Sequence, residues 1–404
     1  MQASSRTTEV NNLSYSISSR DICCQFCTKS FEIETVNPGE QVKCPRCQET
    51  VIRIEKYPVA ITVLYTGLAL FAFILSFKFS LLSTIIPYTK QANTVAIWQI
   101  LSLLTRHGLM FLAFVFLLFV LVLPLIFIVT VLYVYAGIYL QRNYRGLATV
   151  AKLVIGLKPW IMVDLFLVAI TIALIKIRVL VTFQLGYTML TLFSCSVFLA
   201  RVVLTNSDYW LIDKVSEITE IKFDVSEELK GGPWQQNMRL RLQLAWALLI
   251  TSIILYFPAN LLPMMNTSRI FGQSYQNTLL EGVIMLWNSG DYLVSTIIFL
   301  VSFLLPIVKI FILMIILLTL SYKKIFPTIY LSRAHVLIER IGRWSMIDVF
   351  VIMVMTSVFH ERIVSITPGV AIIYFALVVI LTMLATAVVD TRFLWINEAE
   401  NRLN

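Results

Sequence analysis

Two pairs of cysteines near the start of the sequence have the spacing of a metal site. They read CQFC at 24–27 and CPRC at 44–47, with sixteen residues between them. A C-x-x-C pair forms a tight turn whose two thiolates point to one ion, and two such pairs complete the four-cysteine set that zinc favours. The sequence therefore predicts a zinc site with four ligands: Cys24, Cys27, Cys44 and Cys47.

The residues between the cysteine pairs predict a small β module around this site. The stretch FEIETVNPGEQVK alternates like a strand, turns at Pro38–Gly39 and returns, which is typical of a zinc ribbon. A domain of about 35 residues cannot build an adequate core, so metal binding would supply the missing folding free energy. Two disulfides or a redox C-x-x-C motif are the alternatives. The cytoplasmic location inferred below argues against both.

A second group of chemically capable residues lies inside long apolar runs. Ionisable side chains within a membrane are costly and indicate function by default. Lys309 and Asp348 are two such residues, and their predicted pairing would form a buried network that exchanges a proton when its surroundings change. A fixed structural ion pair is the alternative. In three predicted helices, two polar residues at helical spacing share one face, and these three faces would converge on the network. The pairs are Ser302 with Lys309, Ser345 with Asp348, and Thr382 with Thr386.

An earlier part of the chain repeats the acid without the lysine. Asp164 occupies the setting of Asp348, but Phe127 stands where Lys309 would be. We expect Asp164 to pair with Arg201, which aligns with Thr386, and Lys158 is a competing partner. Without an exchangeable lysine, this copy is predicted to be structural.

The stretch YFPANLLPMMN at 256–266 predicts an irregular helix end. Pro258 and Pro263 each lack a backbone donor, so the helix should kink or unwind there, and Asn260 would bond the freed carbonyls. Broken helices at membrane depth often line a cavity. A simple proline kink at a helix end is the alternative.

The composition shows which elements must hold these residues. The chain is 58% hydrophobic and only 14% charged, whereas a soluble protein carries about 25% charged residues. The predicted fold class is an all-α polytopic membrane protein with about eight spans, because about 20 apolar residues cross a bilayer as a helix. The second and sixth spans exceed that length and should tilt or protrude. The expected spans are 58–80, 109–140, 159–176, 180–204, 240–262, 292–320, 344–360 and 367–390.

Lysine and arginine placement predicts the orientation of these spans. With both termini in the cytoplasm, 23 of the 32 Lys and Arg residues lie on the cytoplasmic side. That bias follows the positive-inside rule. The net charge of +9 is therefore mostly a topology signal, and no basic-aromatic stretch indicates nucleic-acid binding.

The sequence contains an internal repeat with a spacing of roughly 180 residues. FILSFKFSLLS (73–83) aligns with IILYFPANLLP (253–263), Pro124 aligns with Pro306, and KPWIMVDLF aligns with GRWSMIDVF. Each copy has four spans, so the two copies have the same orientation. The expected domains are the tail and zinc ribbon (1–56), the first repeat (57–205), a cytoplasmic linker without a second ribbon (206–239), the second repeat (240–395) and a C-terminal tail (396–404).

Several motifs together resemble one known family. The ribbon, the duplicated four-span unit, PANLLP, LPxxK (Leu305 to Lys309) and W-x-M-x-D are similar to the paraquat-inducible protein A family. The resemblance covers about residues 22–395. The chain departs from the family pattern in lacking a second ribbon. No nucleophile with its base, phosphate loop or H-E-x-x-H site is present, so no enzyme is predicted.

This resemblance implies a function. It implies a Gram-negative inner-membrane protein that partners an MCE-domain tunnel protein in the periplasm and handles phospholipid in transport between the two membranes. On the family's motifs it implies ribbon ligands at the four cysteines and a polar network at Ser302, Lys309, Ser345 and Asp348, with Asp164 in the other half. Three alternatives stay open: a scaffold that only anchors the tunnel protein, an efflux protein for small toxic cations, and a ribbon-based redox sensor.

Overall fold

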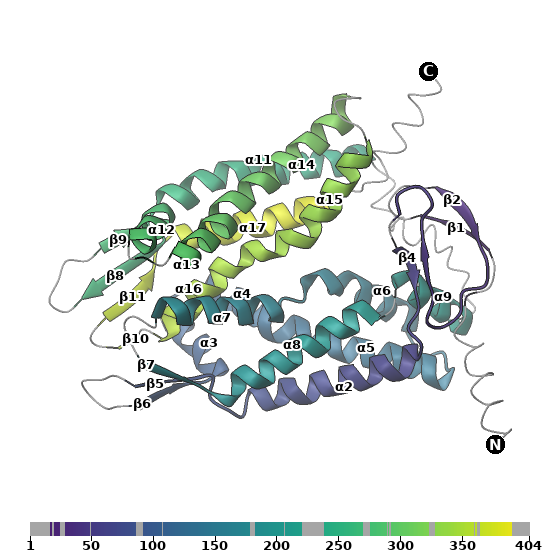
Figure 1. Cartoon of the computed structure of the whole chain (residues 1–404), viewed down its shortest axis with the longest axis horizontal. Helices are drawn as coiled ribbons and strands as arrows, with labels where there is room; N and C mark the ends of the chain where they lie inside the picture. The colour runs from purple at the N-terminus through teal and green to yellow at the C-terminus, as the bar shows by residue number, and fades with distance from the viewer. Residues whose placement is uncertain are drawn as a thin grey trace.

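The chain forms two helical units that lie side by side, with small sheets at one end and a β module at the other (Figure 1). We call these the hairpin end and the ribbon end. The computed structural model describes residues 17, 20–24, 29–48, 50–85, 92–106, 108–177, 182–205, 207–219, 238–269, 275–288, 290, 292–322, 328–358, 360–361 and 364–389. For some of these, Ser345 and Asp348 among them, the description covers the backbone alone.

The first unit is the first predicted repeat, together with one further helix. Its apolar runs form the helices, and short polar segments separate them. In chain order, the elements are α2 (Pro58–Ser76), β5 (Leu82–Ile85), β6 (Ala92–Val95), α3 (Ile97–Arg106), α4 (Met110–Phe116), the π-helix η1 (Leu117–Val122), α5 (Leu123–Leu140), α6 (Leu147–Leu157), the 3₁₀-helix η2 (Lys158–Trp160), α7 (Val163–Ile177), β7 (Thr182–Leu185), α8 (Tyr187–Thr205) and α9 (Asp208–Thr219).

The second unit repeats this plan. In chain order, its elements are α11 (Met238–Leu261), β8 (Met265–Arg269), β9 (Tyr275–Asn277), α12 (Leu279–Asn288), α13 (Tyr292–Ile298), the π-helix η4 (Phe299–Leu304), α14 (Leu305–Tyr322), α15 (Thr328–Gly342), the 3₁₀-helix η5 (Arg343–Met346), α16 (Ile347–Val358), β10 (His360–Glu361), β11 (Val364–Pro368) and α17 (Ala371–Val388). Both copies therefore place a π-helical segment directly before a Leu-Pro step in the long second span.

Seven helical stretches in the described residues are long and apolar enough to cross a membrane. The prediction that the second and sixth spans are longer than a bilayer needs is confirmed, since Ser295–Tyr322 has 28 residues. Met110–Leu140 has 31 residues, or about 46 Å, against a hydrocarbon core of about 30 Å. The predicted span 344–360 contains α16, whose twelve residues are too few to be one of the seven.

Each unit ends in a small antiparallel sheet, and the two sheets fix the register of the repeat. Their strand orders are β6-β5-β7 and β10-β11-β8-β9. Gly186 donates its N–H to Leu81, and Gly369 donates its N–H to Met264 in the same way. A Cβ on either glycine would lie 1.9 Å from a backbone carbonyl oxygen. The same close approach in both units makes these two glycines equivalent.

This register corrects the alignment expected from the sequence. The glycines and the strand pairs show that Leu81 in the first repeat is equivalent to Met264 in the second, and that Leu82 is equivalent to Met265. The predicted alignment of 73–83 with 253–263 is therefore three residues out. A slip of three residues is nearly one helical turn, so it leaves the apolar face almost unchanged and the sequence pattern does not resolve it. Counted from the glycines, Arg201 corresponds to Leu384 and not to Thr386.

The two units meet along α7 and α16, which pack against each other. Phe166 and Phe350 occupy the same position in the two copies, and their rings make an edge contact with centroids 5.9 Å apart. Both rings are fully buried. Contact between equivalent residues is the mark of a two-fold relation, here within one chain.

The proline-containing end of α11 differs from the expectation. The helix runs without a break through Pro258 to Leu261, and the chain then passes Pro263 into β8. The Asn260 amide donates to the Tyr256 carbonyl at 2.8 Å, whereas the carbonyl that loses its donor to Pro258 is that of Ile254. Pro258 therefore does not unwind the helix, which continues for three more residues.

Candidate functional site

The cysteine module at the ribbon end consists of two hairpins. β1 (Arg20–Cys23) pairs with β2 (Ser30–Ile33), and β3 (Gln41–Lys43) pairs with β4 (Thr50–Arg53). The predicted turn at Pro38–Gly39 is present, with Gly39 at φ +101°. It joins the two hairpins, however, and does not pair the strands on either side of it. Each C-x-x-C pair instead follows the first strand of its own hairpin.

Three of the predicted metal ligands lie together. The sulfur atoms of Cys24, Cys44 and Cys47 are all within 4.8 Å of one another. The Cys24 and Cys47 sulfurs are 3.7 Å apart, close to the ~3.8 Å expected of two thiolates on one tetrahedral zinc and far from the ~2.05 Å of a disulfide. The Arg46 N–H points to the Cys44 sulfur at 3.4 Å. Cys27 lies outside the described residues. The three thiols fit a thiolate-bound metal ion.

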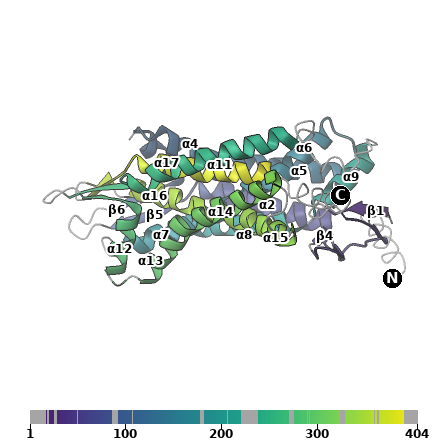
Figure 2. The same ribbon diagram turned by 90° about the horizontal axis from the view of Figure 1, so that it is seen from above.

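The module is fastened to the first repeat and to α9. The Ser207 N–H donates to the Arg53 carbonyl at 3.1 Å. In α9, Trp210 is fully buried and stacks on Tyr135 of α5. Figure 2 shows β4 and α9 at the same end of the molecule. The segment expected to be a plain linker (206–239) thus begins with a packed helix, and its partners include the ribbon.

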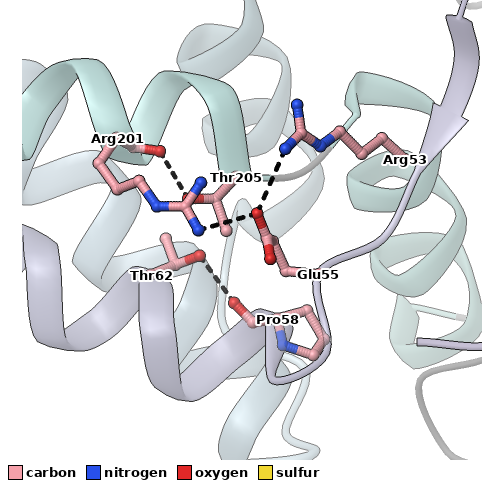
Figure 3. Close-up of polar contacts among 6 residues, drawn as sticks. All are labelled: Arg53, Glu55, Pro58, Thr62, Arg201 and Thr205. Atoms are coloured by element: carbon pink, nitrogen blue, oxygen red, sulfur yellow. Dashed lines mark hydrogen bonds and ion pairs between the residues drawn. The ribbon is translucent and has the colours of Figure 1, made fainter. Parts of the chain in front are cut away.

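The predicted pairing of Arg201 with Asp164 is wrong. Arg201 instead contacts the Glu55 carboxylate at 3.0 Å, and Arg53 approaches the same oxygen at 3.6 Å (Figure 3). The reason is packing: α8 lies along α2, and Glu55 is just ahead of the first residue of α2. Asp164 is exposed in the first turn of α7.

Lys158, the competing partner named for Asp164, also has another acid. Its ammonium group contacts Asp208 at the start of α9. Both basic residues that were predicted to pair with Asp164 therefore form ion pairs at the ribbon end instead, with Glu55 and Asp208.

Lys309 is buried in the second repeat. It is the fifth residue of α14, three residues after Pro306, and it is only 3% exposed. A Cβ built on Gly342 would lie 2.8 Å from the Lys309 Nζ and 3.1 Å from its Cε. A side chain at position 342 would push the flexible end of Lys309 aside, so the glycine lets the amine lie against the backbone of α15. Lys309 of α14 therefore lies against the end of α15. From there the chain continues through η5 into α16, which carries Asp348.

The predicted partners of Lys309 are placed only in part. The side chains of Ser345 and Asp348 lie outside the description, so the Lys309–Asp348 pair stays a prediction. Ser302 is fully buried in η4, and its hydroxyl oxygen has no hydrogen-bond partner among the described residues. It lies two helical turns from Lys309 on the side that the bundle buries, as the spacing predicts.

The two threonines of α17 are buried, but their hydroxyls are used locally. Thr382 donates to the Val379 carbonyl at 2.9 Å, and Thr386 donates to the Thr382 carbonyl at 2.7 Å. Neither hydroxyl hydrogen is available to the predicted network, although both oxygens can still accept.

One buried polar residue near this network was not predicted. His335 of α15 is 6% exposed, and its Nε2 lies 3.2 Å from the Thr386 carbonyl. The repeat carries a signal that would have found it. The buried positions Leu147, Ala151 and Val154 of α6 match Leu331, His335 and Ile338 of α15. A histidine replaces a small apolar residue there.

Comparison with known proteins agrees with the repeat. The family model described as paraquat-inducible protein A matches the chain twice, at residues 59–215 and 242–398. These two ranges have the same spacing as the equivalent glycines. The chain belongs to the paraquat-inducible protein A family. No solved structure matches it.

Curated relatives from this family cover nearly the whole chain. An Escherichia coli (strain K12) protein named "Intermembrane transport protein PqiA" is 29% identical over 95% of this chain and 97% of its own length. A second protein of that strain, "Lipophilic envelope-spanning tunnel protein A", is 30% identical over 92% and 90%. A Haemophilus influenzae "Probable intermembrane transport protein" is 27% identical over 92% and 95%. The chain is thus a multi-pass membrane protein built from two repeats of this family.

Proposed function

We propose that this protein is the inner-membrane subunit of an intermembrane lipid transport system. It loads or extracts phospholipid at the inner membrane and passes it to an MCE-domain tunnel protein in the periplasm. The names of the PqiA-type relatives support transport between membranes. Seven membrane-length helices support a multi-pass location, and the lysine and arginine bias supports cytoplasmic N- and C-termini.

The observation that carries a working role, beyond anchoring, is the buried amine of Lys309. An ammonium group in a membrane core is costly unless it is paired or neutral. A pair with Asp348 would offset that cost, and movement of a proton within the pair would change it. Proton exchange at Lys309–Asp348 then biases the second repeat between two states, which couples lipid movement to the proton gradient. Lipid enters near Pro258, Asn260 and Pro263 in this proposal.

The ribbon has a separate role in the proposal. The thiols of Cys24, Cys44 and Cys47, with Cys27 as the fourth ligand, hold one zinc ion. Zinc supplies folding free energy that so small a module lacks. The folded ribbon fixes the ends of α2, α8 and α9 through the contacts at Glu55 and Arg53.

The test uses Lys309→Ala and Asp348→Asn in cells that lack the native gene, with Val308→Ala as a matched control. Val308 is exposed on the outside of the same helix. Sensitivity of the envelope to detergent is measured beside membrane protein level and co-purification of the tunnel partner. Lost resistance with normal level and normal partner binding supports transport through this pair. Full resistance in both variants contradicts it.

A second candidate function is a membrane anchor that holds the tunnel protein without moving lipid. The close fit of Lys309 against Gly342 favours it, because a tight fit suits a packing element. The same experiment separates the two, since an anchor tolerates both substitutions wherever the protein accumulates.

A further inference from the structure

One face of α15 connects the cytoplasm-side end of α17 to the buried amine of Lys309. Leu331, His335, Ile338 and Gly342 recur at helical spacing, and all four are buried. His335 is the one titratable residue among them. α15 packs against both α14 and α17, so this face lies between the helix that carries Lys309 and the last membrane span.

The contact between His335 and α17 has a defined direction. A carbonyl oxygen only accepts, so the Nε2 of His335 carries the hydrogen and donates to Thr386 at 3.2 Å. Thr386 lies in the last turn of α17, which ends at Val388. Carbonyls in a last turn lack donors within their own helix, and His335 supplies one from another helix. α17 has no charged residue between Ala371 and Val388 that would compete for the imidazole.

The other end of the same face touches Lys309. Gly342 follows His335 by seven residues, two helical turns, so both lie on one side of α15. The Nζ of Lys309 lies 2.8 Å from the position that a Cβ of Gly342 would take. A rotation or shift of α15 therefore moves the backbone against which the amine is seated.

We propose that His335 is a positioning residue for Lys309. Its hydrogen bond to the end of α17 fixes the rotation and height of α15, and α15 in turn holds Gly342 against the amine. This inference rests on the proposed function for its consequence in transport, but the placement of the amine is testable without it. The first repeat supports the assignment, because it has neither part: Ala151 stands in the place of His335, and Phe127 in the place of Lys309.

The experiment measures how readily the amine of Lys309 reacts. The full-length protein in lipid nanodiscs is treated with formaldehyde and a borane reductant, and dimethylation of Lys309 is quantified by peptide mass spectrometry. Four proteins are compared: wild type, His335→Gln, His335→Leu and Leu331→Ala. Glutamine places an amide N–H near the position of Nε2, leucine has no donor, and Leu331→Ala removes packing from the same face without touching the hydrogen bond.

We expect His335→Leu to change the extent of Lys309 labelling by about fivefold, the factor that corresponds to one net hydrogen bond. His335→Gln and Leu331→Ala should stay within twofold of wild type, a range that leaves a fivefold effect clear. If His335→Leu does not accumulate, His335→Asn takes its place, because its shorter side chain cannot reach Thr386. Unchanged labelling in the variant without a donor overturns the proposal, and so does an equal change in Leu331→Ala.

Lipid transfer by the same four proteins separates this inference from the proposed function. We expect His335→Leu to lose transfer and His335→Gln to retain it, since glutamine positions α15 but cannot carry a proton. Loss of transfer in His335→Gln with normal Lys309 labelling would make His335 a proton carrier and overturn the positioning role. If no protein, wild type included, transfers lipid while the labelling pattern holds, the proposed function fails and the positioning of Lys309 stands.

Discussion

The two repeats differ just after the π-helical segment of their long span. The first repeat buries Phe127 there, and the second buries Lys309 at the matching position. Likewise, the first repeat buries the apolar Ala151 where the second buries the polar His335. The backbones of the two copies nevertheless share their order of elements, their Leu-Pro steps and their terminal sheets. One helical plan thus accepts apolar side chains at these positions in one copy and polar, buried ones in the other, so the chemistry is set by side chains and not by topology.

At the ribbon end, the polar contacts described above for the cysteine module belong to the first repeat. The first repeat is tied to the cysteine module through Glu55, Arg201 and the backbone contact at Ser207. Arg53 and Arg201 both contact Glu55, and Lys158 contacts Asp208. The first repeat therefore has the properties of a fixed frame, and the second carries the groups that can change charge.

Removing the metal should have the largest effect and should reach only the first repeat. Structural zinc contributes about 10–16 kcal/mol of apparent binding free energy to small modules at neutral pH, so Cys44→Ser or a strong chelator should unfold the ribbon. Limited proteolysis should then cut within residues 17–54 and leave the second repeat intact. Cys195→Ala, which removes a buried thiol far from the cluster, is the control. A metal content near zero in the purified wild-type protein would contradict the zinc assignment.

Exchanging the two buried residues should come next. Phe127→Lys buries an ammonium group in an apolar core with no designed partner, and an unpaired buried charge destabilises a protein by about 3–5 kcal/mol. Lys309→Met keeps the volume and should cost clearly less than Phe127→Lys, because its predicted partner Asp348 can become neutral by taking up a proton. Thermal unfolding followed by fluorescence-detected size exclusion measures both. Equal stability of the two variants would show that the first repeat holds a hidden partner for a cation.

The equivalent glycines provide a symmetric test. Gly186→Ala and Gly369→Ala each force a Cβ against a backbone carbonyl, and we expect about 2–3 kcal/mol of destabilisation in each case. Gly282→Ala in α12 meets open space and should be neutral or stabilising by about 0.5–1 kcal/mol. The same unfolding assay applies. Clearly unequal losses at the two glycines would argue against the register that relates the repeats.

What could be predicted from the sequence depended on how local the signal was. The cysteine spacing identified Cys24, Cys44 and Cys47, because two knuckles must face one ion whatever surrounds them. The duplicated unit and its long second spans were also predictable from apolar run length. Partners across helices were not: Arg201 bonds to Glu55 because α8 packs on α2, a contact that no spacing along the chain contains. His335 was missed for a related reason, since its acceptor is a backbone carbonyl that leaves no mark in the sequence. Only the comparison with Ala151 of the first repeat would have singled it out.

The smallest expected effect lies at the junction of ribbon and membrane. Arg201→Gln should destabilise the protein by about 0.5–1 kcal/mol, because the pair with Glu55 is partly exposed and solvent screens it. Glu55→Gln should cost a similar amount, and the double variant should cost no more than either alone, since each single change already removes the pair. Asp164→Asn is the control, because Asp164 is exposed and does not pair with Arg201. Additive losses in the double variant would mean that Glu55 and Arg201 act through different partners, and the first repeat would then lack the fixed tie to the ribbon that distinguishes it from the second.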